Sequence, residues 1–302
     1  MRIAEELGLP LVNGDIGIEI EMEGTNLNLG SMNYWRATSD GSLRGESVEW
    51  VNKGPIEKTN IDKVLQYLAS RLEKNYSVLN PSKRCGTHIH VNCQQLTSIQ
   101  VINFISIYLI VEDVLVRSFG DAREGNMFCL RCKDADYLIN NLLQCIRMGS
   151  LRYLQPEMRY SAINPAAINK YGSLEFRSMP SPKDLALISN WAHMFLRMRD
   201  AAEMFNNTKD IVEGISNQGQ IPFLETIFGK YFPLVTCDNM EDMVIDGCRR
   251  VQTIAYEQWP TKKTVVKTQT LQQMENGFFR GEPVVIPTPP DNWMFTTTTN
   301  GI

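Results

Sequence analysis

The clearest secondary-structure signal in the chain is the stretch from Ile16 to Glu23, which reads IGIEIEME. Apolar and acidic residues alternate along it, and successive side chains of a β-strand point to opposite faces of a sheet. The alternation therefore predicts a strand with an apolar face and an acidic face. The apolar face holds Ile18, Ile20 and Met22, and the acidic face holds Glu19, Glu21 and Glu23.

Three further segments, residues 46–51, 87–93 and 172–178, alternate with the same period of two. Each predicts a strand with one apolar face and one polar face. Glu46 stands where its strand begins, so the alternation does not fix its face. The polar faces carry Ser47 and Glu49 in the second strand, His88, His90 and Asn92 in the third, and Ser173, Glu175 and Arg177 in the fourth.

Helical periodicity occupies the intervals between these strands. The apolar spacing predicts one helix over residues 61–74 and a second from Thr97, a good N-cap, to about Phe119. Ser181-Pro182-Lys183-Asp184 supplies an N-cap, a Pro and an early acid, which predicts a helix that runs to Asn206. Further helices are expected over residues 135–147 and 241–257.

This order of strands and helices favours an α+β fold, with an antiparallel sheet covered by helices on one face. No Gly/Ser linker separates two domains. We expect a main domain over residues 1–206 and a C-terminal helical extension and tail over residues 207–302 that packs on the same domain. The last 40 or so residues are rich in Thr and Pro and contain two possible edge strands.

The composition excludes several classes of protein. With 43% hydrophobic residues and a net charge of −4, the chain is too apolar and too evenly charged to be disordered. It also lacks the concentrated positive charge of a dedicated nucleic-acid binder. The most apolar run, residues 101–111, is well short of the ~18 apolar residues of a membrane span. We therefore expect neither nucleic acid nor membrane as a partner.

The cysteines and the first residues indicate a compartment. The seven cysteines are an odd number at irregular spacings, and Cys129-x2-Cys132 has no second pair with which to form a zinc ribbon. The first 15 residues have no continuous apolar stretch to serve as a signal-peptide core. We expect a reducing, cytoplasmic location, with thiols that act mostly as small buried hydrophobic groups.

The polar faces together favour a metal site. An ordinary solvated sheet face mixes charges, because like charges opposite one another are destabilising. Carboxylate-dominated ligation suits the hard ions Mg²⁺ or Mn²⁺ better than zinc. Two of the chain's three histidines and at least four of its acids fall on these faces: His88, His90, Glu19, Glu21, Glu49 and Glu175.

Two arginines add a phosphate-binding character. Arg177 shares a face with Glu175, and Arg159 precedes that strand. The planar guanidinium of Arg matches phosphate oxygens, although an internal ion pair between Glu175 and Arg177 is an alternative. The chain has neither a GxxxxGK[ST] loop nor a GxGxxG motif, so a bound nucleotide would depend on metal and arginines for its phosphates.

Five motifs in order resemble the amidoligase family of the glutamine synthetase and glutamate–cysteine ligase superfamily. The resemblance covers roughly residues 14–180. It implies a curved antiparallel sheet that cradles Mg²⁺ ions, and coupling of ATP hydrolysis to amide-bond formation between a carboxylate and an amine. The motifs are GIEIEME from Gly17, DGSL from Asp40 with Glu49 following, CGTHIHV from Cys85, RYSAIN from Arg159 and SLEFR from Ser173.

The resemblance also implies a role for each matching residue. Glu19, Glu21, His88 and Glu175 would bind metal, with His90 supporting His88 or contacting the substrate or cofactor. Glu49 would serve the metal or the incoming amine. Arg177 and Arg159 would contact the transferring and nucleotide phosphates. The implied partners are small-molecule or peptide carboxylates and amines. Glu46 has no sure counterpart in the family, and the sequence leaves open whether Glu46 or Glu23 joins the metal site.

Three alternatives stay open at this point. A phosphoryl transferase acting on a nitrogen, as in the guanido kinases, would belong to the same superfamily. A metallohydrolase could use His88 and His90 together with carboxylates. A non-catalytic module lined with carboxylates could capture amines or peptides without ATP hydrolysis.

Overall fold

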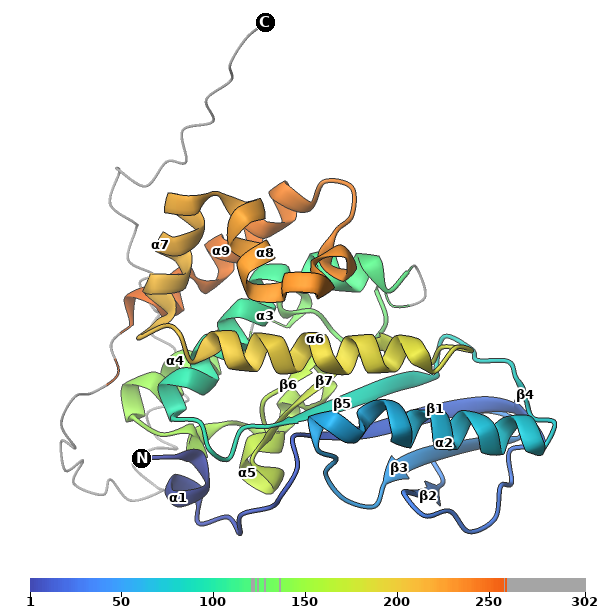
Figure 1. The fold of residues 1–302 in the computed structure, drawn as a ribbon. Helices are drawn as coiled ribbons and strands as arrows, with labels where there is room; N and C mark the ends of the chain where they lie inside the picture. Colours follow the sequence, from blue (N-terminus) through green and yellow to red (C-terminus); the bar gives the residue numbers. More distant parts are fainter. Residues whose placement is uncertain (121–122, 124, 128, 136, 258, 260–302) are drawn as a thin grey trace, which may run out of the picture. The chain divides into compact units, whose positions relative to one another are not determined.

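The computed structural model of the chain describes residues 1–120, 123, 125–127, 129–135, 137–257 and 259. These residues form an α+β fold around an open, seven-stranded antiparallel sheet (Figure 1). The strand order is β2-β3-β1-β5-β7-β6, and β4 pairs with the far end of β1. The strands are β1 (Ile16–Thr25), β2 (Trp35–Thr38), β3 (Ser47–Asn52), β4 (Val78–Leu79), β5 (Gly86–Asn92), β6 (Ile163–Asn164) and β7 (Ser173–Pro180).

Helices separate and cover these strands. The first part of the chain has α1 (Ile3–Leu7), α2 (Ile61–Lys74), α3 (Ser98–Ser118), α4 (Tyr137–Met148) and α5 (Ala167–Tyr171). The later part has α6 (Ala186–Ala202), α7 (Thr208–Gln218), α8 (Gln220–Phe228) and α9 (Met240–Tyr256). The predicted α+β class and antiparallel sheet are confirmed, whereas the glutamine synthetase-like fold stays a prediction.

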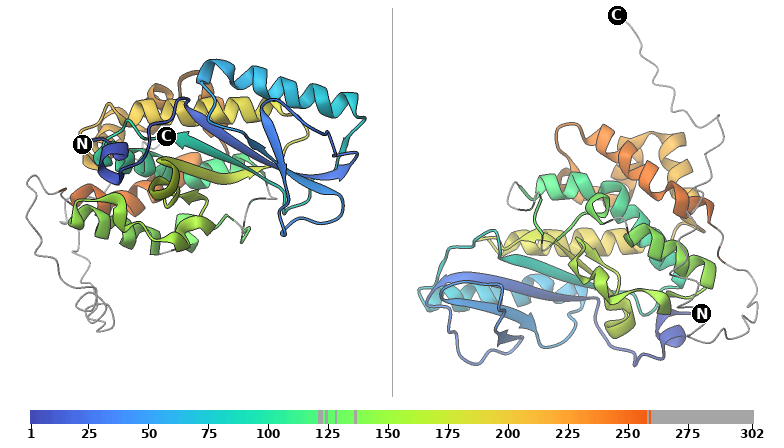
Figure 2. Two further views of the ribbon diagram at one scale, coloured as in Figure 1. Left: turned by 90° about the horizontal axis from the view of Figure 1, so that it is seen from below. Right: turned by 180° about the vertical axis from the view of Figure 1, so that it is seen from behind.

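The apolar sides of the strands face the helices. Ile18, Ile20 and Trp50 are at most 1% exposed, and α2, α3 and α6 pack over that side of the sheet (Figures 1 and 2). Phe176 of β7 stacks on Phe195 of α6, with ring centroids 4.0 Å apart. This burial commits one face of the sheet to the core and leaves the other face for polar side chains.

Helix α3 is the central helix of the core. Thr97 caps it by accepting from the amide of Gln100, as its sequence predicts. The helix is long and apolar enough to cross a membrane, but 89% of its most apolar window is buried within the described residues. On its outer side, Gly247 of α9 sits so close to α3 that an added Cβ would lie 2.1 Å from the carbonyl oxygen of Ile110. The helix is therefore enclosed by protein on several sides.

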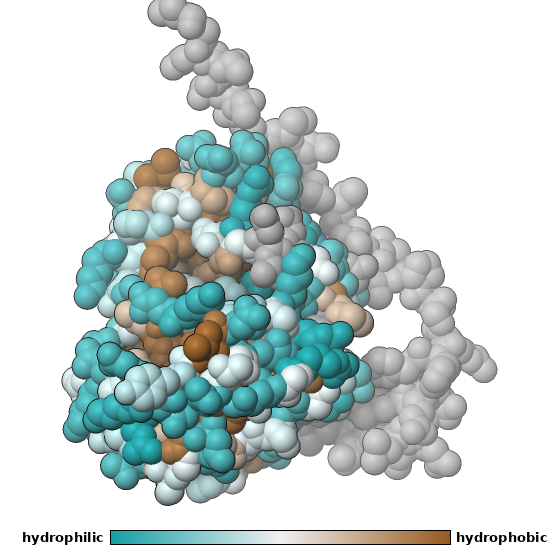
Figure 3. Space-filling view, turned by 90° about the vertical axis from the view of Figure 1, so that its right-hand side faces the viewer, coloured by the Kyte–Doolittle hydropathy of each residue, from teal (hydrophilic) through white to brown (hydrophobic). Residues whose placement is uncertain are grey.

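The C-terminal helices cover α3 and α6. Helix α9 packs along α3, α7 contacts both α9 and α3, and α8 contacts α6 and α7 (Figure 1). The expected division of the chain at residue 206 stays a prediction. The two possible edge strands near the C-terminus lie outside the described residues. On the face drawn in Figure 3 the described residues are mostly hydrophilic, and hydrophobic residues gather in a central band.

One predicted helix is wrong at both ends. Helix α6 begins at Ala186 and ends at Ala202, not at Pro182 and Asn206. The amide of Ser181 donates to the carbonyl oxygen of Cys85 at 3.2 Å, which continues the ladder between β5 and β7. At the other end, Asn207 caps α7 by accepting from the amide of Asp210. Ser181 thus belongs to the hydrogen-bond ladder of the sheet, and Asn207 belongs to the start of the next helix.

Candidate active site

Three rows of side chains cross the sheet on the face opposite the packed helices. The rows follow from the strand register, because residues directly paired across an antiparallel sheet point to the same side. The first row is Thr38, Glu49 and Glu21; the second is Arg36, Val51, Glu19 and His88; the third is Gly17, His90, Glu175 and Asn164. The metal ligands expected from the sequence therefore share one face.

Glu19 lies at the centre of this face. Its Oε2 is 3.3 Å from Nδ1 of His88, and its Oε1 is 3.6 Å from Nε2 of His90. Burial alone would raise the pKa of Glu19, but hydrogen bonds and attraction from the two imidazoles lower it well below its usual range. At His90, the hydrogen bond to Glu19 and the charges of Glu175 and Glu19 outweigh burial and raise the pKa of the imidazole. Glu19 is thus an ionised carboxylate.

Glu175 is almost fully buried and is held by two donors. Nη1 of Arg177 is 2.5 Å from its Oε1, and Nδ2 of Asn164 donates to its Oε2 at 2.6 Å. Although burial raises the pKa of Glu175, His90, Arg177 and His88 together lower it below the usual range. Its Oε1 also lies 3.7 Å from Nδ1 of His88. The internal pair of Glu175 with Arg177 is therefore present and belongs to a larger cluster.

Glu21 and Glu49 sit on the next row with fewer positive neighbours. The amide of Gly86 donates to Oε2 of Glu21 at 2.6 Å, and the hydroxyl of Thr38 donates to Oε2 of Glu49 at 2.5 Å. Burial raises the pKa of both carboxyls despite these bonds. Each gains additional proton affinity from a nearby carboxylate, which is Asp40 for Glu21 and chiefly Glu19 for Glu49.

The donor set fits a hard divalent cation. Three groups of ligand atoms each lie within 4.8 Å of one another: Glu19, His90 and Glu175; Glu19, Glu49 and His88; and Glu21, Asp40 and Glu49. Two ligands of one Mg²⁺ ion are at most about 4.2 Å apart, and the imidazole–carboxylate distances here are 3.3 to 3.9 Å. Carboxylate oxygens dominate the set, as Mg²⁺ and Mn²⁺ prefer.

Three residues considered from the sequence lie elsewhere. Arg159 is exposed on a 3₁₀ helix (Pro156–Tyr160), where its guanidinium lies against the ring and hydroxyl of Tyr160. Glu46 accepts from the amide of Leu27, and Glu23 accepts from the amide of Arg44. Their contacts hold loops, so neither Glu23 nor Glu46 joins the carboxylate cluster.

The structure adds residues that strand alternation did not identify. Asp40 reaches Glu21 and Glu49 from the loop after β2, and Asn164 orients Glu175 from β6. Both stand within quoted motifs, DGSL and RYSAIN, which was the available signal. Arg123 is 3% exposed and donates to the carbonyl oxygens of Ser178 and Arg177. No sequence pattern connected Arg123 to this strand.

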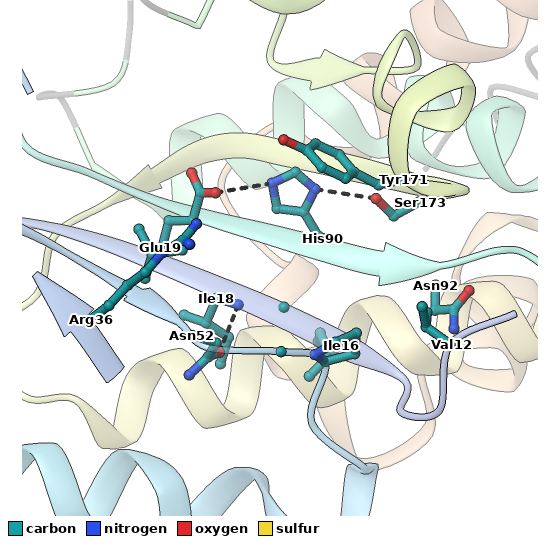
Figure 4. A pocket seen from close by; sticks show the side chains of 14 residues that line it. Val12, Ile16, Ile18, Glu19, Arg36, Asn52, His90, Asn92, Tyr171 and Ser173 are labelled. Carbon is teal, nitrogen blue, oxygen red and sulfur yellow. Dashed lines mark hydrogen bonds and ion pairs between the residues drawn. The ribbon is translucent and has the colours of Figure 1, made fainter. Parts of the chain in front are cut away.

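A pocket opens beside the cluster. Its volume is about 220 Å³, and its walls include Glu19, His90, Arg36, Val51 and Tyr171. Figure 4 shows the ring of His90 between Glu19 and Ser173, with the ring of Tyr171 next to it. The rings of Tyr171 and His90 meet edge to face, with centroids 5.8 Å apart. One wall of the pocket is thus formed by the carboxylate–imidazole cluster of the sheet.

Buried ionisable groups with shifted pKa values beside a pocket are typical of an enzyme active site. The family model described as "Putative amidoligase enzyme" matches residues 53–198 of this chain. The match supports an amidoligase family and, with it, a ligase-type enzyme. It includes His88, His90, Arg159, Glu175 and Arg177 and begins after Glu19, Glu21 and Glu49. No curated protein matches the chain.

Proposed function

We propose that the protein is an ATP- and Mg²⁺-dependent carboxylate–amine ligase that forms an amide or peptide bond through an acyl phosphate. Mn²⁺ would be able to replace Mg²⁺. The observation that carries the proposal is the excess of negative charge on one sheet face. Five carboxylates, those of Glu19, Glu21, Asp40, Glu49 and Glu175, gather beside two imidazoles and one guanidinium.

Bound cations would stabilise such a cluster, because buried carboxylates that lack partners are costly to desolvate. Glu19, Glu21, His88 and Glu175 would be the principal ligands, and Asp40 and Glu49 complete two of the candidate groups. Bound Mg²⁺ would neutralise charge on the phosphates of ATP and polarise the phosphoryl group that is transferred. The amidoligase match is consistent with a reaction of this class.

In this proposal Arg177 acts on the phosphate. Its Nη1 holds Glu175 at 2.5 Å, so the guanidinium lies beside the cluster in a fixed orientation. Arg123 supports it by donating to its carbonyl oxygen at 2.7 Å. A guanidinium fixed in this way stabilises charge on a transferring phosphoryl group without reorganising.

The bond-forming steps need a carboxylate and an amine. The substrate carboxylate oxygen attacks the γ-phosphorus of ATP, ADP leaves, and the acyl phosphate forms. The amine nitrogen then attacks the acyl carbon, inorganic phosphate leaves, and a base takes the proton of the amine. Glu49 is the candidate base, since burial raises the pKa of its carboxyl and its Oε2 is oriented by Thr38.

The decisive experiment measures phosphate release from Mg²⁺-ATP with pools of carboxylates and of amines. Release that requires both pools supports a ligase, and release that ignores both contradicts it. Glu175→Gln should abolish turnover, while Glu225→Gln, at an exposed site on α8, should leave it unchanged. Wild-type turnover in Glu175→Gln would overturn the proposal. Zinc retained through dialysis, with hydrolysis in the absence of ATP, would favour the metallohydrolase alternative.

A further inference from the structure

The pocket beside the cluster owes its shape to two features of the sheet. The third row has no side chain from β1, because Gly17 stands there opposite His90. It has none from β3 either, because that strand ends at Asn52. The result is a hollow in the sheet face between Val51 and His90, and its floor is the backbone of Gly17.

The walls of this hollow are mainly apolar. Val12, Val51, Pro55 and the ring of Tyr171 line it. Val12 and Tyr171 are 41% and 51% exposed, so apolar surface continues to the mouth. A volume of about 220 Å³ lies below the usual range for drug-sized ligands, roughly 300–1,000 Å³, and suits a group the size of an amino-acid side chain.

Arg36 supplies a cation at the edge of the hollow. It pairs with Val51, which pairs with Glu19, so the three side chains form one row that points to the same side of the sheet. Two strand spacings separate the backbones of Arg36 and Glu19 by about 10 Å, a gap that a long arginine side chain narrows. Within the described part of the chain, Arg36 is exposed and has no hydrogen-bond or ion-pair partner.

We propose that this pocket binds the amine substrate, and that this substrate is an α-amino acid with an apolar side chain. The α-carboxylate pairs with Arg36, the apolar side chain enters the hollow over Gly17, and the α-amine faces the carboxylates of the cluster. The arrangement provides one contact of each kind, cationic, apolar and anionic, within the reach of a single amino acid. The role as substrate, but not the binding itself, rests on the proposed ligase function.

The test measures binding by titration calorimetry in the presence of Mg²⁺ and does not depend on turnover. Wild-type protein should bind L-phenylalanine at least about tenfold more tightly than L-phenylalaninamide, which lacks the carboxylate, or 3-phenylpropionate, which lacks the amine. Arg36→Met should remove the preference for the acid over the amide. Arg249→Met, at an exposed arginine of α9, should retain it.

A second variant tests the hollow itself. A Cβ added to Gly17 would meet only the Cβ of His90, at an ordinary 3.5 Å, and Gly17 has no positive φ, so the strand should accept valine. Gly17→Val should weaken L-phenylalanine binding at least about tenfold while L-alanine binds as before.

Three results would overturn the assignment. The first is that wild-type protein binds L-phenylalanine and L-phenylalaninamide equally well, and the second is that Arg36→Met keeps the wild-type preference for the acid. The third is that Gly17→Val loses binding of a non-hydrolysable ATP analogue and keeps binding of L-phenylalanine. Selective phenylalanine binding without Mg²⁺-ATP turnover would leave the pocket assigned and defeat the ligase. Ligase turnover without selective phenylalanine binding would support the ligase and contradict the assignment of the pocket.

Discussion

Glu21 and Glu49 lie directly opposite each other on β1 and β3, with both carboxyls at least half-buried on the same face of the sheet. Like charges in such a pair normally destabilise a sheet by roughly 0.2–1 kcal/mol. Burial and neighbouring carboxylates raise the pKa of both groups. The two carboxyls therefore repel each other when both are ionised, and the cation that we propose would offset this repulsion.

The first prediction follows from this pair. Without metal, the free energy of unfolding of Glu49→Gln should exceed that of the wild-type protein by roughly 0.5–1 kcal/mol. The substitution removes one of two opposed carboxylates and keeps an acceptor for the hydroxyl of Thr38. The same variant should gain less stability from Mg²⁺. Urea unfolding with and without Mg²⁺ measures both effects. Glu46→Gln, a neighbour outside the cluster, should show neither, and a Mg²⁺ response of wild-type size in Glu49→Gln would contradict the assignment.

A second prediction separates two arginines. Arg177→Lys keeps a positive charge beside Glu175 but loses the planar fork, so ATP-dependent phosphate release should fall about 10²-fold. Arg159→Met should change release by less than about twofold, because Arg159 is exposed and lies against Tyr160. Steady-state kinetics of both variants decide the matter. A large loss in Arg159→Met would restore the role that the family resemblance implies.

The alternation of residues along four strands was enough to predict the shared face of Glu19, His88 and Glu175. Side chains repeat every second residue, and the strand pairing then leaves little freedom. Asp40 and Arg123 could not be predicted in this way, because they reach the site from loops whose paths depend on the whole fold. The pocket depends on an absent side chain at Gly17 and on where β3 ends, neither of which carries a periodic signal.

A third prediction concerns Gly86, the first residue of β5, the strand that carries both histidines. A Cβ at Gly86 would lie 3.3 Å from both Oε2 of Glu21 and Nε2 of His88, so both ligands would have to move by a few tenths of an ångström. Gly86→Ala should therefore weaken Mg²⁺ binding about tenfold and leave the fold intact. Calorimetric titration with Mg²⁺ measures the change. Gly41→Ala adds a Cβ in open space and should bind Mg²⁺ like the wild-type protein. Equal Mg²⁺ affinities of Gly86→Ala and Gly41→Ala would contradict the placement of the metal beside Glu21 and His88.

A fourth prediction tests the partner of Glu175. Asn164 donates to Oε2 of that carboxylate at 2.6 Å and fixes its orientation. Asn164→Ala should reduce Mg²⁺ affinity by about 10–100-fold, the usual effect of removing a group that orients a metal ligand. Circular dichroism should show an unchanged fold, and Asn206→Ala, at an exposed site before α7, serves as the control. Unaltered metal affinity in Asn164→Ala would remove Glu175 from the list of ligands.

The last prediction concerns Glu112, which is fully buried in α3 away from the cluster. Its Oε2 accepts from the amide of Cys132 at 2.7 Å, and Arg250 of α9 approaches it to 3.9 Å. Burial raises the pKa of Glu112 from 4.5 to about 8, more than these contacts lower it. Between these two pH values the folded state therefore holds a proton that the unfolded state has released.

Unfolding consequently releases this proton, and the contribution of Glu112 to stability declines as pH rises from about 4.5 to about 8 and levels off above it. Glu112→Gln keeps an acceptor for Cys132 and carries no charge, so it should become progressively more stable than the wild-type protein over this range. The difference in the free energy of unfolding between the variant and the wild-type protein should grow by about 1.4 kcal/mol for each pH unit within this range. Urea unfolding at pH 5, 7 and 9 measures it, with Glu213→Gln, at an exposed site on α7, as the control. Parallel stability profiles for wild type and Glu112→Gln would show that the carboxyl ionises in the folded protein at its ordinary pKa.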